Sequence, residues 1–169
     1  LPHRADPDQG IRVSADLTPL ELLQIAALPE ANGYECVIVD AMVEPDYMAK
    51  LEELCDGALL FASSCILGFQ VAHGARVARA IRAKFPKLPI LWGGWFPSVQ
   101  PELYLKEGIA DAVALGQGEQ TFWECVQAID HGTSLEDVAG LALLKDGRVH
   151  YTAHRTVVGA RHGGSAVRG

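Results

Sequence analysis

The sequence lacks the long apolar runs of a membrane protein and lacks an excess of basic residues. No stretch of its 169 residues approaches the ~18–20 consecutive apolar residues of a transmembrane helix, and its first ten residues lack the apolar stretch of a signal peptide. Fourteen Lys and Arg against 21 Asp and Glu give a net charge of −7, which argues against a broad basic face for nucleic acid. We therefore expect a cytoplasmic protein with no membrane span and no nucleic-acid partner.

Cysteine is scarce and scattered. Cys36, Cys55, Cys65 and Cys125 are separated by 18, 9 and 59 residues, a spacing that fits neither a zinc module nor a disulfide framework. We interpret three of them as buried thiols, because apolar segments surround them. An apolar content of 49% is enough for one core in a chain of this length. The chain begins at Leu1 rather than at methionine, so we expect a piece of a longer protein.

Short β-branched runs alternate with longer segments of helical period, which is typical of a parallel sheet with crossover helices. We predict an α/β, flavodoxin-like (Rossmann-like) fold with a doubly wound, parallel five-stranded sheet and a small C-terminal β-hairpin. The predicted strands are Ile11–Ala15, Cys36–Val39, Ala58–Ala62, Ile90–Trp92 and Ala112–Leu115. The predicted helices are Leu20–Leu28, Tyr47–Cys55, Val71–Phe85, Pro101–Glu107 and Gln120–Ile129, and Pro29 predicts a break or kink before Gly33.

The last third of the chain carries a hairpin and a tail. Asp146-Gly147 lies between two apolar runs, which predicts a hairpin over residues 140–151. From Thr152 the periodicity is lost and Gly and Arg increase. We therefore predict one domain over residues 1–151, with 152–169 as a linker or disordered tail toward an absent catalytic domain.

Ligands of open parallel sheets bind at the carboxyl ends of the strands, where loops run into helix N-termini. Three of the four predicted loops at this edge are rich in small residues, which allows close approach of a ligand to the backbone and leaves amide groups for oxygen atoms. The four loops are Asp16–Glu21, Ser63–Gly68, Gly93–Ser98 and Gly116–Glu119. Such an edge fits a large, flat or phosphate-bearing ligand.

Two of these loops resemble the cobalamin-binding signature, in which a Ser-x-Leu is followed by a Gly pair. Here Ser64-Cys65-Ile66 precedes Gly93-Gly94 by 26 residues, with Ile66 in place of Leu. The first part of the signature, Asp-x-His-x-x-Gly, falls on Asp16–Glu21, where Asp16 matches but Thr18 replaces the cobalt-ligating His and Glu21 replaces the Gly. The resemblance implies a cobalamin whose nucleotide tail is detached from cobalt and buried, and whose lower face has no histidine ligand.

A signature without this histidine resembles one subgroup, the N-terminal cobalamin-binding domains of radical S-adenosylmethionine enzymes. The similarity extends over residues 18–155. The motifs GGWFPS and GQGE are part of the similarity, and within the subgroup the anaerobic magnesium-protoporphyrin IX monomethyl ester cyclase type is nearest. The resemblance implies a radical S-adenosylmethionine catalytic domain in cis or in trans, acting as a methyltransferase or an oxidative cyclase. The cluster motif CxxxCxxC is absent here, so S-adenosylmethionine and the iron–sulfur cluster are expected only in that other domain, and the chain is not catalytic alone.

The predicted cofactor-binding residues come from all four loops, and neither a catalytic residue nor a metal ligand is predicted. Ser63 and Ser64 are expected to hydrogen-bond the buried base, the glycines to admit it, and Trp95 to shield the corrin or to dock a neighbouring domain. The full set is Thr18, Leu20, Ser63, Ser64, Cys65, Leu67, Gly93, Gly94, Trp95, Pro97, Ser98, Gly116, Gln117, Gly118, Glu119 and Thr121.

Other readings of the same residues stay open. In these readings the glycines serve only to make tight turns, and Glu119 serves only to cap a helix. Cys65 is either a small residue that lines the ligand slot or a nucleophile. His73 is expected to be an ordinary helix residue. The alternative for the whole chain is a non-enzymatic flavodoxin-like module that binds a nucleotide or flavin or serves protein contacts. A receiver domain is disfavoured, because Ala62 and Ser63 stand where its phosphoacceptor Asp would be.

Overall fold

The computed structural model describes residues 19–66 and 68–155. Within this part of the chain, strands alternate with helices from β1 to α6, whereas α1 is followed by α2 without a strand between them. The strands are β1 Phe61–Ser64, β2 Ile90–Gly93, β3 Ala112–Ala114, β4 Leu141–Lys145 and β5 Arg148–Tyr151. The helices are α1 Leu20–Ala31, α2 Tyr47–Leu54, α3 Phe69–Lys84, α4 Trp95–Val99, α5 Pro101–Lys106 and α6 Glu119–Asp130, with a short 3₁₀ turn, η1, at Leu135–Asp137.

The strands form one five-stranded sheet in the order β1-β2-β3-β4-β5. The first three strands are parallel, whereas β4 and β5 are antiparallel additions. The α/β class and the hairpin are confirmed. The described sheet also has five strands, but it is mixed: three of the predicted parallel strands are present, and the other two strands are those of the hairpin. Asp146 and Gly147 have φ angles of 51° and 73°, the left-handed pair that a two-residue hairpin turn needs.

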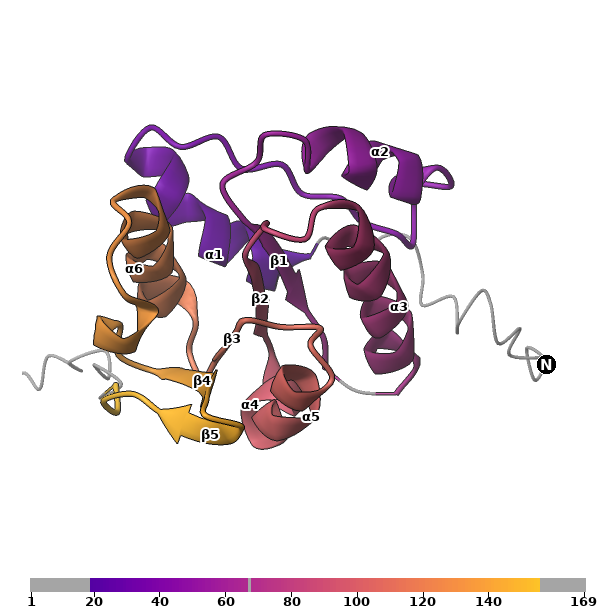
Figure 1. The fold of residues 1–169 in the computed structure, drawn as a ribbon. Helices are drawn as coiled ribbons and strands as arrows, with labels where there is room; N and C mark the ends of the chain where they lie inside the picture. Colours follow the sequence, from indigo (N-terminus) through magenta and orange to yellow (C-terminus); the bar gives the residue numbers. More distant parts are fainter. Residues whose placement is uncertain (1–18, 67, 156–169) are drawn as a thin grey trace, which may run out of the picture.

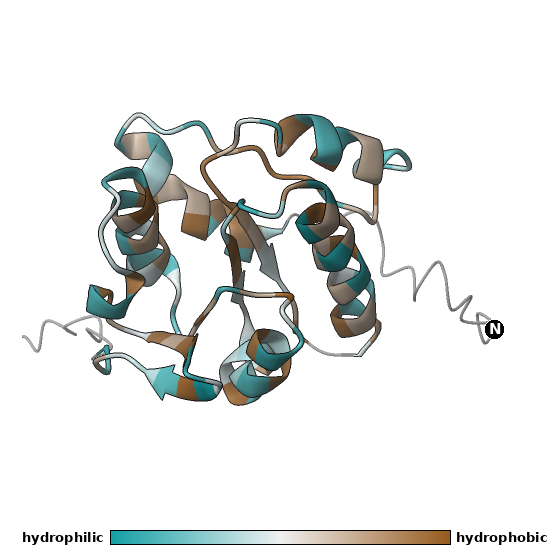
Figure 2. Cartoon of the chain, viewed as in Figure 1, coloured by the Kyte–Doolittle hydropathy of each residue, from teal (hydrophilic) through white to brown (hydrophobic). Residues whose placement is uncertain are grey.

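Helices cover both faces of the sheet, with α3 on one side and α6 and α1 on the other (Figure 1). Side chains alternate along the strands: Ile90 and Trp92 pack with α3 and α5, whereas Leu91 packs with α6. Apolar residues occur along the central strands and on parts of the covering helices, whose other residues are hydrophilic (Figure 2). Two apolar layers therefore enclose the parallel strands and leave their carboxyl ends as the place for loops.

Two predicted features differ in the structure. Cys36–Val39 belongs to no strand of the described sheet and lies in the connection between α1 and α2. A strand needs a hydrogen-bonded neighbour for its backbone groups, and this segment pairs with none of the five described strands. The predicted strand Ile11–Ala15 lies outside the described residues. Pro29 does not break α1, which continues to Ala31 and ends before Gly33, where φ is +88°.

Pro29 lies inside α1, two residues before its end. Its ring is fully buried, and its carbonyl accepts hydrogen bonds from the N–H groups of Asn32 and Tyr34. Among the described residues, no helix has the length and apolar character required to cross a membrane.

Candidate functional site: three loops at one edge of the sheet

Three of the four predicted loops meet at the carboxyl edge of the parallel strands. Ser64 ends β1 and pairs in register with Gly93, which ends β2, while β3 ends one strand further along. The fourth loop is described only from Pro19, and Leu20 opens α1 with 65% of its surface exposed. The topology thus places the serine loop, the glycine pair and the Gly116–Glu119 turn side by side.

The serine loop and the glycine pair touch through backbone. At Gly94, φ is +95°, and an added Cβ would lie 2.3 Å from the Cys65 carbonyl oxygen and 2.9 Å from Ser64 Oγ. The Cys65 N–H also donates to the Gly93 carbonyl at 3.3 Å. Gly94 is therefore required by the close contact of two loops, whether or not a ligand is bound.

Gly93 is in a different situation, although it is the other half of the pair. An added Cβ there would meet only the Ala114 side chain, at 4.0 Å. Its backbone is half-buried, and its φ lies outside the left-handed region. Space beside Gly93, rather than beside Gly94, is what a ligand could use to approach the backbone.

Ser98 connects the second loop to the third. Its hydroxyl lies 2.7 Å from the Gly94 carbonyl and 3.2 Å from the Ala114 carbonyl, and it accepts a hydrogen bond from the Gly116 N–H at 3.1 Å. The expectation that these loops offer unpaired amide groups is therefore wrong for Gly116, because the Ser98 hydroxyl satisfies that N–H.

Cys65 turns its side chain away from the loop surface. The thiol is 3% exposed, and Sγ lies 3.2 Å from the Tyr104 hydroxyl of α5. Burial raises the pKa of the Cys65 thiol, and the Tyr104 hydrogen bond only partly opposes this effect. A protonated, buried thiol is a poor nucleophile, so the arrangement favours the small-residue reading of Cys65 over the nucleophile reading.

The third loop leads from β3 into α6. Gly116 has a φ of +70°, and an added Cβ on Gly118 would lie 3.8 Å from Ile25 of α1. Gln117 is exposed, and Glu119 is the acidic residue of the first turn of α6. A carboxylate at this position stabilises the helix N-terminus, which is the capping role that the sequence leaves open for Glu119.

Thr121 is fully buried, and its hydroxyl is already used within the protein. It accepts a hydrogen bond from Arg155 Nε at 2.9 Å and donates to the Ala139 carbonyl at 3.2 Å. The Arg155 guanidinium also pairs with Glu124. Thr121 therefore contributes to packing between α6 and the hairpin.

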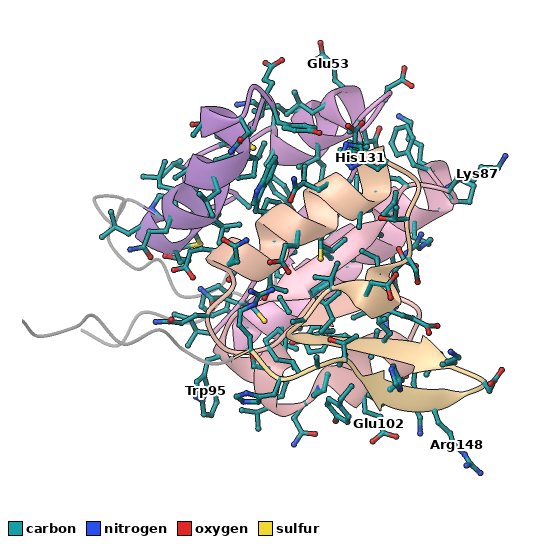
Figure 3. The ribbon with its side chains drawn as sticks, turned by 90° about the vertical axis from the view of Figure 1, so that its left-hand side faces the viewer. Glu53, Lys87, Trp95, Glu102, His131 and Arg148 are labelled. Atoms are coloured by element: carbon teal, nitrogen blue, oxygen red, sulfur yellow. The ribbon has the colours of Figure 1, made fainter. Side chains whose placement is uncertain are left out.

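The remaining predicted site residues vary in exposure. Trp95 is 60% exposed and its side chain points outward (Figure 3), whereas Pro97 is fully buried. His73, as expected for a helix residue, lies half-buried with Nε2 2.9 Å from the Tyr47 hydroxyl. Burial lowers the His73 pKa, and Arg76 adds a smaller effect. Thr18 and Leu67 lie outside the described residues, and the assignment of all these residues to a ligand stays a prediction.

Sequence reasoning missed two residues that hold the serine loop. Tyr104 lies beneath the loop against Cys65, and the Gln70 side-chain oxygen accepts a hydrogen bond from the Ile66 N–H at 2.9 Å. A polar residue placed shortly after Gly68 is the kind of signal that could have indicated Gln70. Nothing local identifies Tyr104, because it comes from α5, 39 residues along the chain.

Two hollows lie away from this edge. One of about 340 Å³ lies between the C-terminal half of α6 and η1, and one of about 610 Å³ lies by Leu88 and Pro89 at the amino ends of β1 and β2. In residues 19–66 and 68–155, no group of three or more His, Cys, Asp or Glu side chains is arranged to hold a metal ion.

Comparison with known proteins connects this chain to one cofactor. A family model described as the B12 binding domain matches residues 9–126. The chain is 28% identical over 156 residues to the anaerobic magnesium-protoporphyrin IX monomethyl ester cyclase of Synechocystis, covering 88% of this chain and 30% of that protein. It is 34% identical over 145 residues to an uncharacterized methyltransferase of Pyrococcus horikoshii, covering 83% of this chain and 31% of that protein.

Solved structures share the fold at low identity. The radical S-adenosylmethionine methyltransferase TsrM from Kitasatospora setae, with cobalamin and a [4Fe-4S] cluster bound, superposes with a TM-score of 0.74 at 20% identity, over 90% of this chain and 29% of that one. The cobalamin-dependent S-adenosylmethionine radical enzyme OxsB, with aqua-cobalamin and S-adenosylmethionine bound, gives 0.70 at 17% identity, over 83% and 20%. For comparison, this chain spans about 30% of the length of the two curated relatives named above.

The family model covers most of the chain, including β1, β2, β3 and the three loops that follow them. The expected resemblance to cobalamin-binding domains of radical S-adenosylmethionine enzymes is confirmed, and cobalamin is the cofactor that goes with it. The chain belongs to the B12-binding domain family.

Proposed function

We propose that the three-loop edge binds cobalamin with its nucleotide tail detached and inserted between the serine loop and the glycine pair. The observation that carries this proposal is the alignment of Ser64 with Gly93 across neighbouring parallel strands, with the Ala114 side chain, at 4.0 Å, as the nearest group to a Cβ built on Gly93. Ser63 and Ser64 are half-buried at this point and supply hydroxyl groups for a buried base. No histidine ligand to the lower face is proposed, because Thr18 occupies that place in the signature.

The residues at this edge fit such a ligand. Each of the three loops contains a small residue within two positions of the strand end, namely Cys65, Gly94 and Gly116, and this allows a flat heterocycle and its ribose to approach the backbone. Beside this edge, Trp95 presents an exposed aromatic surface to a corrin ring or to a neighbouring domain. The chain's part in this function is to bind, to orient and to exclude water.

We further propose that this domain works with a radical S-adenosylmethionine catalytic domain, in cis or in trans. The chain matches less than a third of each of its two curated relatives, whose names describe a cyclase and a methyltransferase. When bound, cobalamin supplies a cobalt centre for methyl transfer or for a radical cyclisation step. S-adenosylmethionine and the iron–sulfur cluster belong to the catalytic domain, and a cytoplasmic location stays a prediction from the sequence.

The test is retention of hydroxocobalamin by the purified chain after removal of free ligand, under reducing and non-reducing conditions. Near-stoichiometric retention with the absorption spectrum of a tail-detached cobalamin is expected. Gly93→Val should abolish retention while the far-UV circular dichroism stays native, because the side chain would fill the space beside β2. Ala83→Val, at an exposed position near the C-terminal end of α3 and outside the three loops, is the matched control.

Two results would contradict the proposal. Retention of FMN with no retention of corrinoids would support the flavin-binding alternative. Retention that survives Gly93→Val would place the ligand elsewhere on the molecule. If the folded chain retains neither ligand, the same measurement on the longer protein with its catalytic domain decides whether the corrin must be covered from both sides.

A further inference from the structure

The Ser98 hydroxyl lies at the junction of two loops that belong to different strands. One partner, the Gly94 carbonyl, is four residues back, at the N-cap of the same short helix, while Ala114, at the end of β3, and Gly116, on the third loop, are 16 and 18 residues away. A serine that bonds only to the carbonyl four residues before it is common in helices. The contacts across to β3 are therefore the informative ones.

The hydrogen-bonding capacity of this hydroxyl is largely used. A serine hydroxyl has one proton to donate and two lone pairs. The proton goes to the Gly94 carbonyl at 2.7 Å, with the Ala114 carbonyl as the second acceptor at 3.2 Å, and one lone pair receives the Gly116 N–H. Ser98 thus has no proton left for a ligand without giving up one of these bonds.

Ser98 also continues the contact that Gly94 makes with the serine loop. The Gly94 backbone already abuts the Cys65 carbonyl, and Ser98 links the Gly94 carbonyl to Gly116. One hydroxyl therefore couples the third loop to a pair of loops that are already in contact. Removing it would leave the Gly116 turn, with its φ of +70°, without this tie.

We propose that Ser98 is a positioning residue that sets the separation of the glycine-pair loop and the Gly116 loop, and that it does not contact the cofactor through its hydroxyl. This inference rests on the proposed cobalamin function for its effect on affinity, but the tie between the loops exists in the cofactor-free protein. It revises the expectation that Ser98 is itself a cofactor-binding residue.

The experiment compares Ser98→Ala, Ser98→Thr and the wild-type chain by two measurements. The first is amide hydrogen exchange at Gly116, followed by NMR in the cofactor-free protein. The second is the dissociation constant for hydroxocobalamin by equilibrium dialysis. Ser134→Ala is the matched control, because the Ser134 hydroxyl accepts a local bond from the Glu136 N–H and lies after α6, outside the three loops.

Loss of the tie should accelerate exchange at Gly116 about tenfold and weaken cobalamin binding by a similar factor, as expected for one hydrogen bond. Ser98→Thr keeps the hydroxyl, so its exchange rate at Gly116 and its dissociation constant should both lie within about threefold of the wild-type values. Ser134→Ala should change neither quantity. Weaker binding by Ser98→Ala with unchanged exchange at Gly116 would instead make Ser98 a ligand contact.

Other outcomes separate this inference from the proposed function. Faster exchange with an unchanged dissociation constant would show that the tie exists but does not set affinity, which overturns the positioning role. If the wild-type chain and the longer protein both fail to bind cobalamin, the proposed function fails and the affinity part fails with it. The exchange measurement would still decide whether Ser98 holds the two loops together.

Discussion

The Trp92 indole occupies the space that a side chain on Gly74 would need. A Cβ added to Gly74, in the middle of α3, would lie 2.5 Å from Cη2 of Trp92 on β2. Trp92 is 1% exposed, its indole donates from Nε1 to the Ile109 carbonyl at 2.9 Å, and its ring lies tilted by 47° against Tyr104 with ring centroids 4.6 Å apart. A helix glycine therefore lets α3 approach the sheet at its largest side chain.

Gly74→Ala should destabilise the protein although alanine is the better helix former. The gain in helix propensity is about 1 kcal/mol, whereas forcing a methyl group against a fixed indole costs about 1–3 kcal/mol. Urea unfolding should therefore give a lower midpoint for Gly74→Ala. Ala83→Gly, at an exposed position of the same helix, reports the propensity effect alone. A Gly74→Ala protein more stable than the wild type would show that α3 can move away from Trp92.

The two glycines of the pair should respond differently to the same substitution. Gly94→Ala places a methyl group against the Cys65 carbonyl at a φ of +95°, so we expect a loss of about 2 kcal/mol or more. Gly93→Ala has room and should change the free energy of unfolding by less than about 1 kcal/mol. Chemical denaturation of the cofactor-free chain measures both. Equal effects at the two positions would contradict the different surroundings assigned to them.

Arg155 should stabilise the junction between α6 and the hairpin. Its guanidinium bonds Thr121, Glu124 and the Ala139 carbonyl while it is only partly exposed. Arg155→Ala leaves the buried Thr121 hydroxyl with one partner fewer, and we expect a loss of about 1–2 kcal/mol. Arg148→Ala, on the exposed edge strand β5, should cost less than about 0.5 kcal/mol. Thermal unfolding of both variants gives the comparison, and similar losses would argue that the Arg155 network carries no net stability.

Alkaline pH should destabilise the fold through Cys125. Burial raises the pKa of this thiol to about 12, from an unperturbed value of 9.0. Above pH 9 the unfolded chain loses the proton while the folded chain keeps it, so stability that is complete below pH 9 falls as pH rises toward 12. The slope from one such group is about 1.4 kcal/mol per pH unit. Cys125→Ala should be less stable at pH 7 and should show a shallower decline above pH 9 in urea titrations. An unchanged slope would mean that Cys125 makes no contribution to the alkaline loss.

The sequence pattern predicts the sheet where strands are buried on both faces. Ile90 and Ala112 begin their strands where predicted, because continuous apolar runs bounded by turns leave few alternatives. The first described strand begins at Phe61 rather than at Ala58, since pairing with Ile90 decides which backbone groups join the ladder. Hydrophobicity alone carries no information on that register.

The structure of the loops and the contacts between them are less predictable from the local sequence than the strands are. The sequence predicts a loop over Gly93–Ser98, yet α4 begins at Trp95, because proline is tolerated in the first turn of a helix. The contacts of Ser98 with the third loop and of Tyr104 with Cys65 join residues 18 and 39 apart, and no spacing rule connects them. The motif residues could be identified from the sequence, whereas the contacts among them required the fold.

The described strands stand in the sheet in the same order as they occur in the chain. Each strand from β2 to β5 pairs with the strand that precedes it, so within residues 19–66 and 68–155 no strand has to be inserted between two earlier ones. During synthesis, when the N-terminal part emerges first, every new strand can dock on an edge that is already formed. This part of the sheet can therefore grow in one direction at the pace of translation, ending with the local closure of the β4–β5 hairpin.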